Sequence, residues 1–291
     1  MTTAATIRTE PVDTWGGRLT LSFQIKGSGP PLLYLHPAGG LIWDGLLDSL
    51  ARRFTVYAPV FPGTDPSDTM AIHQLDDIND VVLAYQGALQ ALGVEGAPVI
   101  GQSFGGMLAA ELAATFPELF SRLILLAPAG LWNESAPWSL DFMTAPAEAL
   151  PRLLFKDPSC EGARVMFRPA ASPEQALDEA VRSIWTLGCA AKFLWPVPDR
   201  GLSRRLHRLS APTLIIWGAD DALIPVSYAQ EYLRLVPHAR VEIIPDCGHM
   251  LQAEQPSITA DLIDNFLCNN DATWTGKPSP TRADTGVHAR R

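Results

Sequence analysis

The sequence predicts an α/β protein built on a mostly parallel sheet. Short apolar runs alternate with stretches of helical spacing through the first 130 residues, and the same alternation resumes after residue 209. Strands separated by helices at this interval form βαβ units, and the resulting sheet is buried on both faces. The chain has 291 residues, 47% of them hydrophobic, so it is long enough to bury a large core.

The elements of the first part of the chain follow from two kinds of pattern. Residues 19–26 alternate apolar and polar side chains as a half-buried strand does, and the later runs are short, apolar and bounded by turn residues. Helices are predicted where apolar residues recur on one face, as Leu46, Leu47 and Leu50 do. The predicted strands cover residues 19–26, 31–35, 54–60, 98–100 and 123–127, and the predicted helices cover residues 41–51, 76–92 and 104–115.

The alternation of strands and helices stops between residues 131 and 209. No convincing buried strand occurs there, and the helical patches fall at residues 147–155 and 173–193. The series then closes with strands at residues 212–217 and 240–244 and helices at residues 226–236 and 256–268.

These boundaries predict one sheet domain that is split by an insertion. Residues 1–130 and 210–268 form the core in this interpretation, and residues 131–209 form an inserted helical segment. Residues 269–291 are rich in Thr, Gly, Pro, Lys and Arg and have few apolar side chains, which predicts a disordered tail.

Composition excludes several classes of protein. The formal net charge is −9, so the molecule repels phosphate backbones and anionic lipid, and we expect neither nucleic-acid nor membrane partners. The start of the chain lacks the pattern of a signal peptide, and no 18 consecutive residues are apolar. The cysteines are too few and too scattered for a disulfide framework or a zinc site, so we expect reduced thiols and a cytoplasmic location. They are Cys160, Cys189, Cys247 and Cys268.

The strongest local signal for chemistry is Gly101-Gln-Ser-Phe-Gly105, which lies between a predicted strand and a predicted helix. A Ser on so sharp a turn adopts a strained backbone, and the small residues on either side let strand and helix pass closely. The turn exposes the Ser103 hydroxyl and aims the Phe104 N–H, at the start of a helix, toward developing negative charge. Ser103 is therefore the predicted nucleophile.

A serine hydroxyl is a weak nucleophile and requires a positioned base. His249 has the best context of the six histidines, because it follows Ser103 in the chain and lies just after the last predicted strand. His36 ends an early strand, where structural hydrogen bonding is expected. The remaining histidines, for which surface or tail positions are expected, are His73, His207, His238 and His288.

The acid that orients the base should follow a late strand. Asp220 and Asp221 are adjacent candidates after residues 212–217, and only one of them can hold the imidazole. Asp246 is a third candidate, but its closeness to His249 in sequence favours a role in a turn. The residues by themselves leave this choice open.

With these motifs in place, the chain resembles the α/β-hydrolase superfamily from about residue 19 to residue 268. The likeness rests on the elbow at residues 101–106, on Trp217-Gly-Ala-Asp-Asp-Ala-Leu-Ile-Pro225 and on Cys247-Gly-His-Met-Leu-Gln-Ala-Glu-Gln-Pro256. It implies an eight-stranded sheet with an inserted helical cap, and it selects Asp221 as the acid three residues after Gly218. Glu254 and Pro256 fit the family's usual ending, where they open the last helix, and no catalytic role is assigned to them.

The resemblance also implies an oxyanion hole made of two backbone N–H groups. Phe104 supplies the first, and the second comes from the loop after the early strand, here His36-Pro-Ala-Gly-Gly40. Pro37 has no N–H, so Ala38 is the predicted donor by position, and Gly39 is the alternative.

Acyl transfer to water is the reaction that this set of residues predicts. The expected substrate is a small, apolar or aromatic ester, lactone or thioester, and the alternative is a carbon–carbon bond hydrolase of ring-cleavage diketones. That alternative group resembles the chain in its Asp-Cys-Gly-His stretch, although it typically has Trp where this chain has Met250. A dehalogenase or epoxide hydrolase is disfavoured because those relatives place Asp at the position of Ser103. The alternative outside the enzymes is a non-catalytic ligand receptor on the same fold, which is the less favoured hypothesis.

No cofactor and no metal are expected for such chemistry. The chain has no dinucleotide, nucleotide or zinc-protease motif. The expected partner is a small-molecule substrate, and association into a homodimer is left open. Four of the eight tryptophans lie at residues 131–209, where they suit an apolar pocket or the docking of helices.

Overall fold

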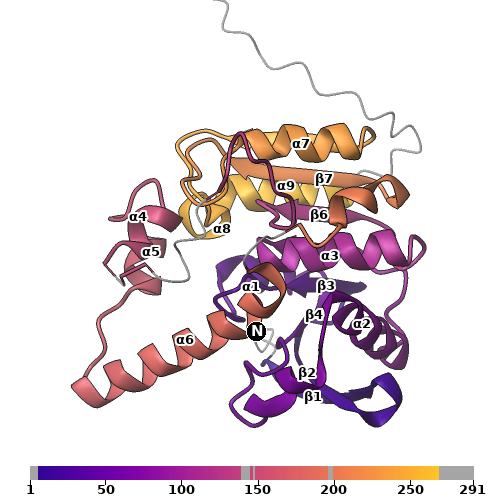
Figure 1. Ribbon diagram of the computed structural model, residues 1–291, viewed down its shortest axis with the longest axis horizontal. Helices are drawn as coiled ribbons and strands as arrows, with labels where there is room; N and C mark the ends of the chain where they lie inside the picture. The colour runs from indigo at the N-terminus through magenta and orange to yellow at the C-terminus, as the bar shows by residue number, and fades with distance from the viewer. Residues whose placement is uncertain (1–5, 139–144, 147, 196–198, 269–291) are drawn as a thin grey trace, which may run out of the picture.

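One eight-stranded sheet runs through the computed structural model, which describes residues 6–138, 145–146, 148–195 and 199–268 (Figure 1). The order of its strands is β1-β2-β4-β3-β5-β6-β7-β8. The strands are β1 (Arg8–Thr14), β2 (Leu19–Lys26), β3 (Pro31–Leu35), β4 (Thr55–Pro59), β5 (Val99–Gln102), β6 (Leu123–Leu126), β7 (Thr213–Gly218) and β8 (Arg240–Ile244). The predicted tail at residues 269–291 lies outside the described residues.

The sheet is mostly parallel, as predicted. Only β2 runs against its neighbours, since it pairs antiparallel with both β1 and β4. The other neighbours are parallel, and Ile100 of β5 lies opposite Tyr34 of β3 and Ile124 of β6. The four residues of β5 and the four of β6 are all buried, because helices cover both faces of the sheet at its centre.

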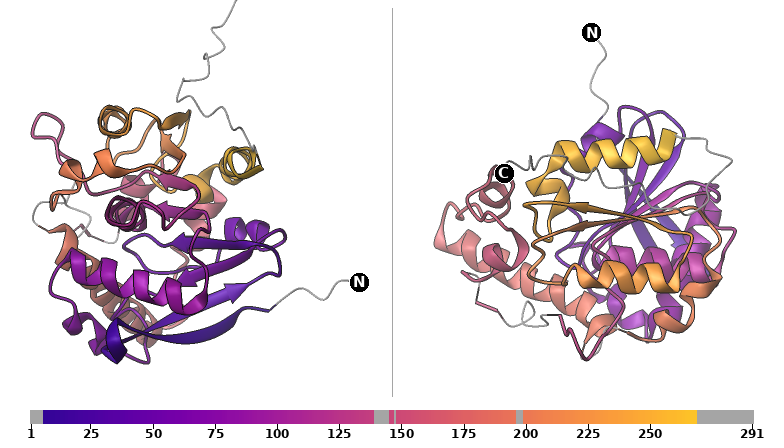
Figure 2. Two further views of the ribbon diagram at one scale, coloured as in Figure 1. Left: turned by 90° about the vertical axis from the view of Figure 1, so that its right-hand side faces the viewer. Right: turned by 90° about the horizontal axis from the view of Figure 1, so that it is seen from above.

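The helices of the core divide between the two faces of the sheet. In the right-hand view of Figure 2, α9 lies on one side of the sheet and α3 and α7 lie on the other. α1 contacts α9, and α2 contacts α3, so each face has a layer of helices. The bounds are α1 (Gly45–Leu50), α2 (Ile78–Leu92), α3 (Phe104–Thr115), α7 (Ser227–Leu235) and α9 (Pro256–Cys268).

α3 is the central helix, and its sequence suits that position. Eleven of its twelve residues are buried, and several of them are Gly or Ala, which let the helix lie close to β5 and β6. Its one charged residue, Glu111, is 2% exposed and accepts two hydrogen bonds from the Arg205 guanidinium, at 2.8 and 2.6 Å. This bidentate pair satisfies a carboxylate that would be costly to bury alone.

The described part of the inserted segment at residues 131–209 consists of helices and loops, with no strand. It contains α4 (Leu150–Leu154), α5 (Glu161–Met166), α6 (Pro173–Leu194) and two short 3₁₀ helices at Leu202–Arg204 and Leu206–Arg208. α4, α5 and α6 extend from one side of the molecule, at the left of Figure 1. The boundaries that would separate a core from a cap stay a prediction. Among the described helices, none has both the length and the apolar content to cross a bilayer.

Candidate active site

Ser103 occupies a sharp turn between β5 and α3. Its backbone has φ 52° and ψ −114°, a combination that costs free energy for a residue with a side chain. The surrounding backbone holds this conformation: the Ser103 N–H donates to Leu126 O at 2.8 Å, and Ser103 O accepts from the N–H groups of Met107 and Ala129, both at 3.0 Å. The strain is therefore stabilised by the strand and the helix on either side.

Glycines make the turn possible by removing Cβ atoms at two close approaches. A Cβ at Gly105 would lie 2.1 Å from Leu35 O, and a Cβ at Gly101 would lie 2.4 Å from Gly105 O. Neither contact can be relieved by a side-chain rotation, because the neighbouring atoms are backbone. The strand–turn–helix context predicted for the Gly101-Gln-Ser-Phe-Gly105 motif is present.

His249 and Asp221 form a buried hydrogen-bonded pair. His249 Nδ1 lies 2.8 Å from Asp221 Oδ2, and the other carboxylate oxygen accepts from the N–H groups of Leu223 and Ile224, each at 2.9 Å. A carboxylate oxygen accepts, so Nδ1 carries the hydrogen and Nε2 of the neutral ring presents a lone pair. Nε2 is buried and has no hydrogen-bond partner among the described residues.

The two other acids considered from the sequence point elsewhere. The Asp220 carboxylate pairs with Lys156 Nζ at 2.7 Å, and both side chains are partly exposed. Asp246 has φ 49°, and its carbonyl oxygen accepts from Gln255 Nε2 at 3.2 Å, so it shapes a turn. Of the three candidates, Asp221 is the one whose carboxylate hydrogen-bonds to the His249 ring.

A buried polar network joins the segment of Ser103 to the segment of His249. Gln102, just before Ser103, accepts from Gln252 Nε2 at 2.7 Å through its Oε1 and donates to Met250 Sδ at 3.5 Å. Tyr34 OH donates to the same Oε1 at 3.0 Å. These contacts place the residues after His249 directly beside the elbow. The sequence analysis missed this network, and no local pattern marks it, since Gln102 and Gln252 are 150 residues apart.

Two backbone N–H groups predicted to bind an oxyanion donate no hydrogen bond to any described residue. Phe104 begins α3, and Ala38 lies on the loop after β3. The N–H of Gly39 likewise donates to no residue that the structure describes, so both alternatives for the second donor remain. The loop is held by His36, whose Nδ1 donates to Pro37 O at 2.7 Å and whose Nε2 accepts from the Phe61 N–H at 3.0 Å.

Comparison with known proteins decides the family. A profile of the alpha/beta hydrolase family matches residues 32–262. The chain belongs to the α/β-hydrolase family. The predicted α/β-hydrolase sheet and the prediction that the protein is a hydrolase are thereby confirmed, whereas the cap stays a prediction.

Relatives of this α/β hydrolase act on more than one kind of bond. A 2-hydroxy-6-oxononadienedioate/2-hydroxy-6-oxononatrienedioate hydrolase from Comamonas testosteroni is 30% identical, over 84% of this chain and 89% of the relative. A pimeloyl-(acyl-carrier protein) methyl ester esterase from Nitrosomonas europaea is 25% identical, over 79% of this chain and 92% of the relative. The crystal structure of a bacterial membrane phospholipase A has a TM-score of 0.72 at 23% identity and covers 91% of this chain and 86% of its own; this likeness concerns the fold.

Among the described histidines, His249 is the one that hydrogen-bonds to the Asp221 carboxylate. His36 is 5% exposed, and burial lowers its pKa to about 4, so it is neutral and structural as expected. His73 and His207 are exposed, as predicted for surface positions. His238 differs from that prediction, since it is half-buried and its Nε2 lies 3.2 Å from Ala211 O. His288 lies outside the described residues.

The inserted segment of the hydrolase reaches the loops beside the elbow through α6. Trp185 Nε1 donates to Gly63 O at 2.7 Å, and a Cβ at Gly40 would lie 3.2 Å from Thr186 Cγ2. Trp138 is buried, whereas Trp195 is 47% exposed. The contacts of Trp185 thus support helix docking as a role for at least one tryptophan of this segment.

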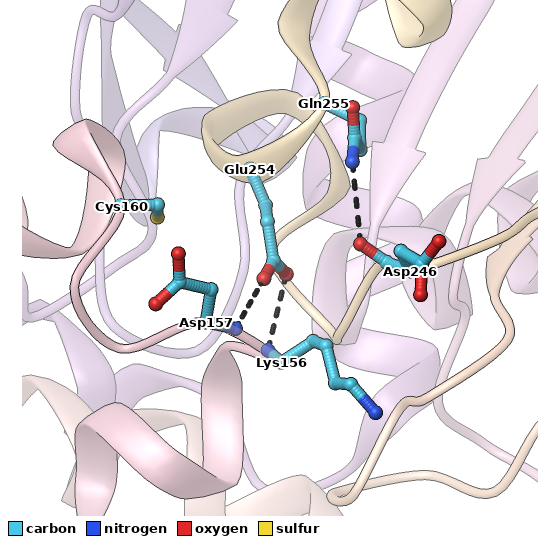
Figure 3. Close-up of a pocket in the computed structure, with 6 residues that line it drawn as sticks. All are labelled: Lys156, Asp157, Cys160, Asp246, Glu254 and Gln255. Carbon is cyan, nitrogen blue, oxygen red and sulfur yellow. Dashed lines mark hydrogen bonds between the residues drawn. The ribbon is translucent and has the colours of Figure 1, made fainter.

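A separate cavity of about 530 Å³ lies where the inserted segment meets the loop before His249 (Figure 3). None of the predicted site residues lines it. Its walls are Lys156, Asp157, Cys160, Asp246, Glu254 and Gln255. Among the described residues, no group of three or more His, Cys, Asp or Glu side chains is placed to hold a metal ion.

Proposed function

We propose that the protein is a serine hydrolase that cleaves a small, apolar or aromatic ester, lactone or thioester. The observation that carries this proposal is the His249 ring, which is hydrogen-bonded to Asp221 through Nδ1 and whose Nε2 has no hydrogen-bond partner among the described residues. The ring lies on a segment that packs against the residue before Ser103, whose backbone has the strained conformation of a nucleophile elbow.

The reaction proceeds in two steps. His249 Nε2 takes the Ser103 proton as Oγ bonds to the substrate carbonyl carbon, and the carbonyl oxygen becomes an oxyanion. The N–H groups of Phe104 and of Ala38 or Gly39 stabilise that charge. His249 then gives the proton to the leaving oxygen or sulfur, and the acyl-enzyme forms. Water, deprotonated by His249, attacks the acyl carbon, releases the acid and restores Ser103.

The Asp221 carboxylate keeps the imidazole in the tautomer that this sequence of steps requires. It holds the hydrogen on Nδ1 and stabilises the positive charge that His249 carries in each transition state. The second carboxylate oxygen of Asp221 accepts hydrogen bonds from the N–H groups of Leu223 and Ile224. The carboxylate therefore cannot rotate away from the imidazole ring without losing both of these hydrogen bonds.

Substitution of the nucleophile tests the proposal directly. Ser103→Ala should abolish the hydrolysis of p-nitrophenyl esters without lowering the melting temperature, since it removes one oxygen atom. Ser227→Ala, which changes an exposed serine on α7, is the matched control and should keep wild-type activity. An active-site phosphonate should label wild-type protein on Ser103, whereas a receptor with a disabled site would resist labelling. Ester hydrolysis by Ser103→Ala above the level of a control without enzyme would contradict the proposal.

Cleavage of a carbon–carbon bond is the second candidate, and the relatives support it about as well. The hydrolase of Comamonas testosteroni named above is the observation in its favour. Attack on a ketone carbonyl forms the same oxyanion, but the leaving group is a carbanion that must be stabilised by conjugation and then protonated. The residues described here are compatible with either leaving group.

One panel of substrates separates the two candidates. It contains p-nitrophenyl esters of increasing chain length and a vinylogous diketone, each assayed for kcat/KM under the same conditions. A higher kcat/KM for the esters supports acyl transfer, and the reverse order assigns the protein to the carbon–carbon bond hydrolases. The Ser103→Ala variant serves as the blank for every substrate.

A further inference from the structure

The carboxylate of Glu254 ties two separate parts of the chain together. Glu254 Oε2 accepts from the Gly248 N–H at 2.7 Å and from the Lys156 N–H at 3.2 Å, and Oε1 accepts from the Asp157 N–H at 2.6 Å. Figure 3 shows the carboxylate pointing at the backbone of Lys156 and Asp157. One side chain thus satisfies N–H groups of the inserted segment and of the loop before His249.

The backbone of His249 is itself hydrogen-bonded to the inserted segment. Leu154 O accepts from the His249 N–H at 2.9 Å and from the Met250 N–H at 3.1 Å. Gly248 passes so close that a Cβ there would lie 2.7 Å from Lys156 N and 3.0 Å from Leu154 O. The predicted base is therefore positioned by residues 154–157 as well as by the sheet.

Side-chain contacts extend the same junction. Phe155, Ala163 and Met250 form a small buried cluster that is distinct from the main core. The Lys156 ammonium pairs with Asp220, the residue before Asp221. Residues 154–157 accordingly contact both the loop that carries the acid and the loop that carries the base.

We propose that Glu254 is a positioning residue for His249, and that it acts by clamping residues 154–157 of the inserted segment to the loop at residues 248–250. The inference rests on the proposed function, in which His249 is the base. The Asp221 carboxylate fixes the ring through Nδ1 alone, so the place of Nε2 relative to Ser103 also depends on where the His249 backbone lies. Removal of the clamp leaves three N–H groups unpaired and frees that backbone to shift.

Two substitutions at Glu254 and one control test the clamp. Glu254→Ala removes all three acceptor contacts. Glu254→Gln keeps the size and one accepting oxygen but turns an NH₂ group toward a backbone N–H. Glu161→Gln changes an exposed glutamate of α5 in the same inserted segment and is the matched control. We expect kcat to fall about 10- to 100-fold in Glu254→Ala, as for a small displacement of a reacting group, and to fall less in Glu254→Gln.

The pattern of the loss distinguishes positioning of His249 from shaping of the substrate pocket. If Glu254 acts through His249, kcat falls by the same factor for p-nitrophenyl acetate, butyrate and octanoate, and KM does not change. A KM that rises with chain length while kcat is kept would overturn the proposal. So would a kcat within twofold of the wild type in both folded Glu254 variants. If Glu254→Ala does not fold, Glu254→Gln still decides the question.

Proton NMR gives a reading that needs no substrate. The hydrogen shared by His249 Nδ1 and Asp221 should give a downfield resonance, which is assigned by its loss in Asp221→Ala. It should broaden or exchange faster in the Glu254 variants and stay unchanged in Glu161→Gln. An unchanged resonance in folded Glu254→Ala would contradict the clamp. Failure of the proposed function would look different, since wild-type protein would then cleave none of the substrates and Ser103 would not be labelled.

Discussion

His36 shows how one buried side chain can hold a loop of the site. Its Nε2 accepts from the Phe61 N–H, and a backbone N–H can only donate, so the neutral ring carries its hydrogen on Nδ1, which donates to Pro37 O. Protonation would place a second hydrogen on Nε2 against the Phe61 N–H and would bury a charge. Burial lowers the pKa of His36 to about 4.

This lowered pKa predicts a pH-dependent contribution to stability. The unfolded chain binds the proton with a pKa near 6.5, so the stabilisation by neutral His36 is complete above that pH and is lost as the pH falls toward 4. The free energy of unfolding should lose about 2 kcal/mol from this residue between pH 7.5 and pH 5. Urea unfolding of wild type and His36→Gln at both pH values isolates the effect. The advantage of wild type should shrink by that amount, and a constant difference would refute it.

At this scale the sequence predicts some contacts of the site and cannot predict others. The elbow motif and the chain order indicate Ser103 and His249. The choice of Asp221 over Asp220 needed the family resemblance, and the structure gives a physical reason, since the Asp220 carboxylate pairs with Lys156 and the Asp221 carboxylate pairs with His249. Glu254 accepts hydrogen bonds from Lys156 and Asp157, which precede it in the chain by 98 and 97 positions. Such distant contacts produce no periodic pattern in a sequence.

At the scale of elements, the close approach at the elbow makes a steric prediction. Gly105→Ala would place a Cβ 2.1 Å from Leu35 O, so α3 must move away from β3. We expect a destabilisation of about 1–3 kcal/mol, typical of overpacking, and a loss of ester hydrolysis as the Phe104 N–H is displaced. Thermal and urea unfolding measure the first effect, and the substrate panel measures the second.

Gly188 of α6 provides the matched control for Gly105. A Cβ there meets nothing within 4 Å, and the residue lies inside a helix. Gly188→Ala should therefore stabilise the protein by up to about 1 kcal/mol through helix propensity, with activity kept. Equal changes in the free energy of unfolding in Gly105→Ala and Gly188→Ala would contradict the steric prediction, because they would mean that the backbone at the elbow can accommodate a Cβ.

Elements with strong periodicity were predictable, and short or edge elements were not. The strand at residues 19–26 agrees with β2, and the helix at residues 104–115 agrees with α3. β1 was missed because Val12 and Thr14 are its only buried residues, so backbone pairing with β2 holds it at the sheet edge without an apolar pattern. α1 begins at Gly45, later than the predicted residue 41, because the Asp44 side chain caps it by accepting from the Leu47 N–H.

At the scale of the whole molecule, α6 is packed at one end and exposed at the other. Its last turns bury Cys189, Phe193 and Leu194 against the main core, while residues 173–185 are exposed on every face. Leu177, Val181 and Ile184 are 65%, 59% and 73% exposed, although they recur at helical spacing. Helical stability depends mostly on tertiary packing of one face, so the two ends of α6 should differ in stability.

Amide hydrogen exchange tests this difference within a single helix. Local opening of the exposed half needs no disruption of the core, so its amides should exchange orders of magnitude faster than those of residues 189–194 and of α3, which open only with larger units. Exchange followed by NMR or mass spectrometry gives both rates in one experiment, with the packed end of α6 as the internal control. Equal protection along α6 would show that its apolar residues are covered in solution, because buried contacts are what slow such opening.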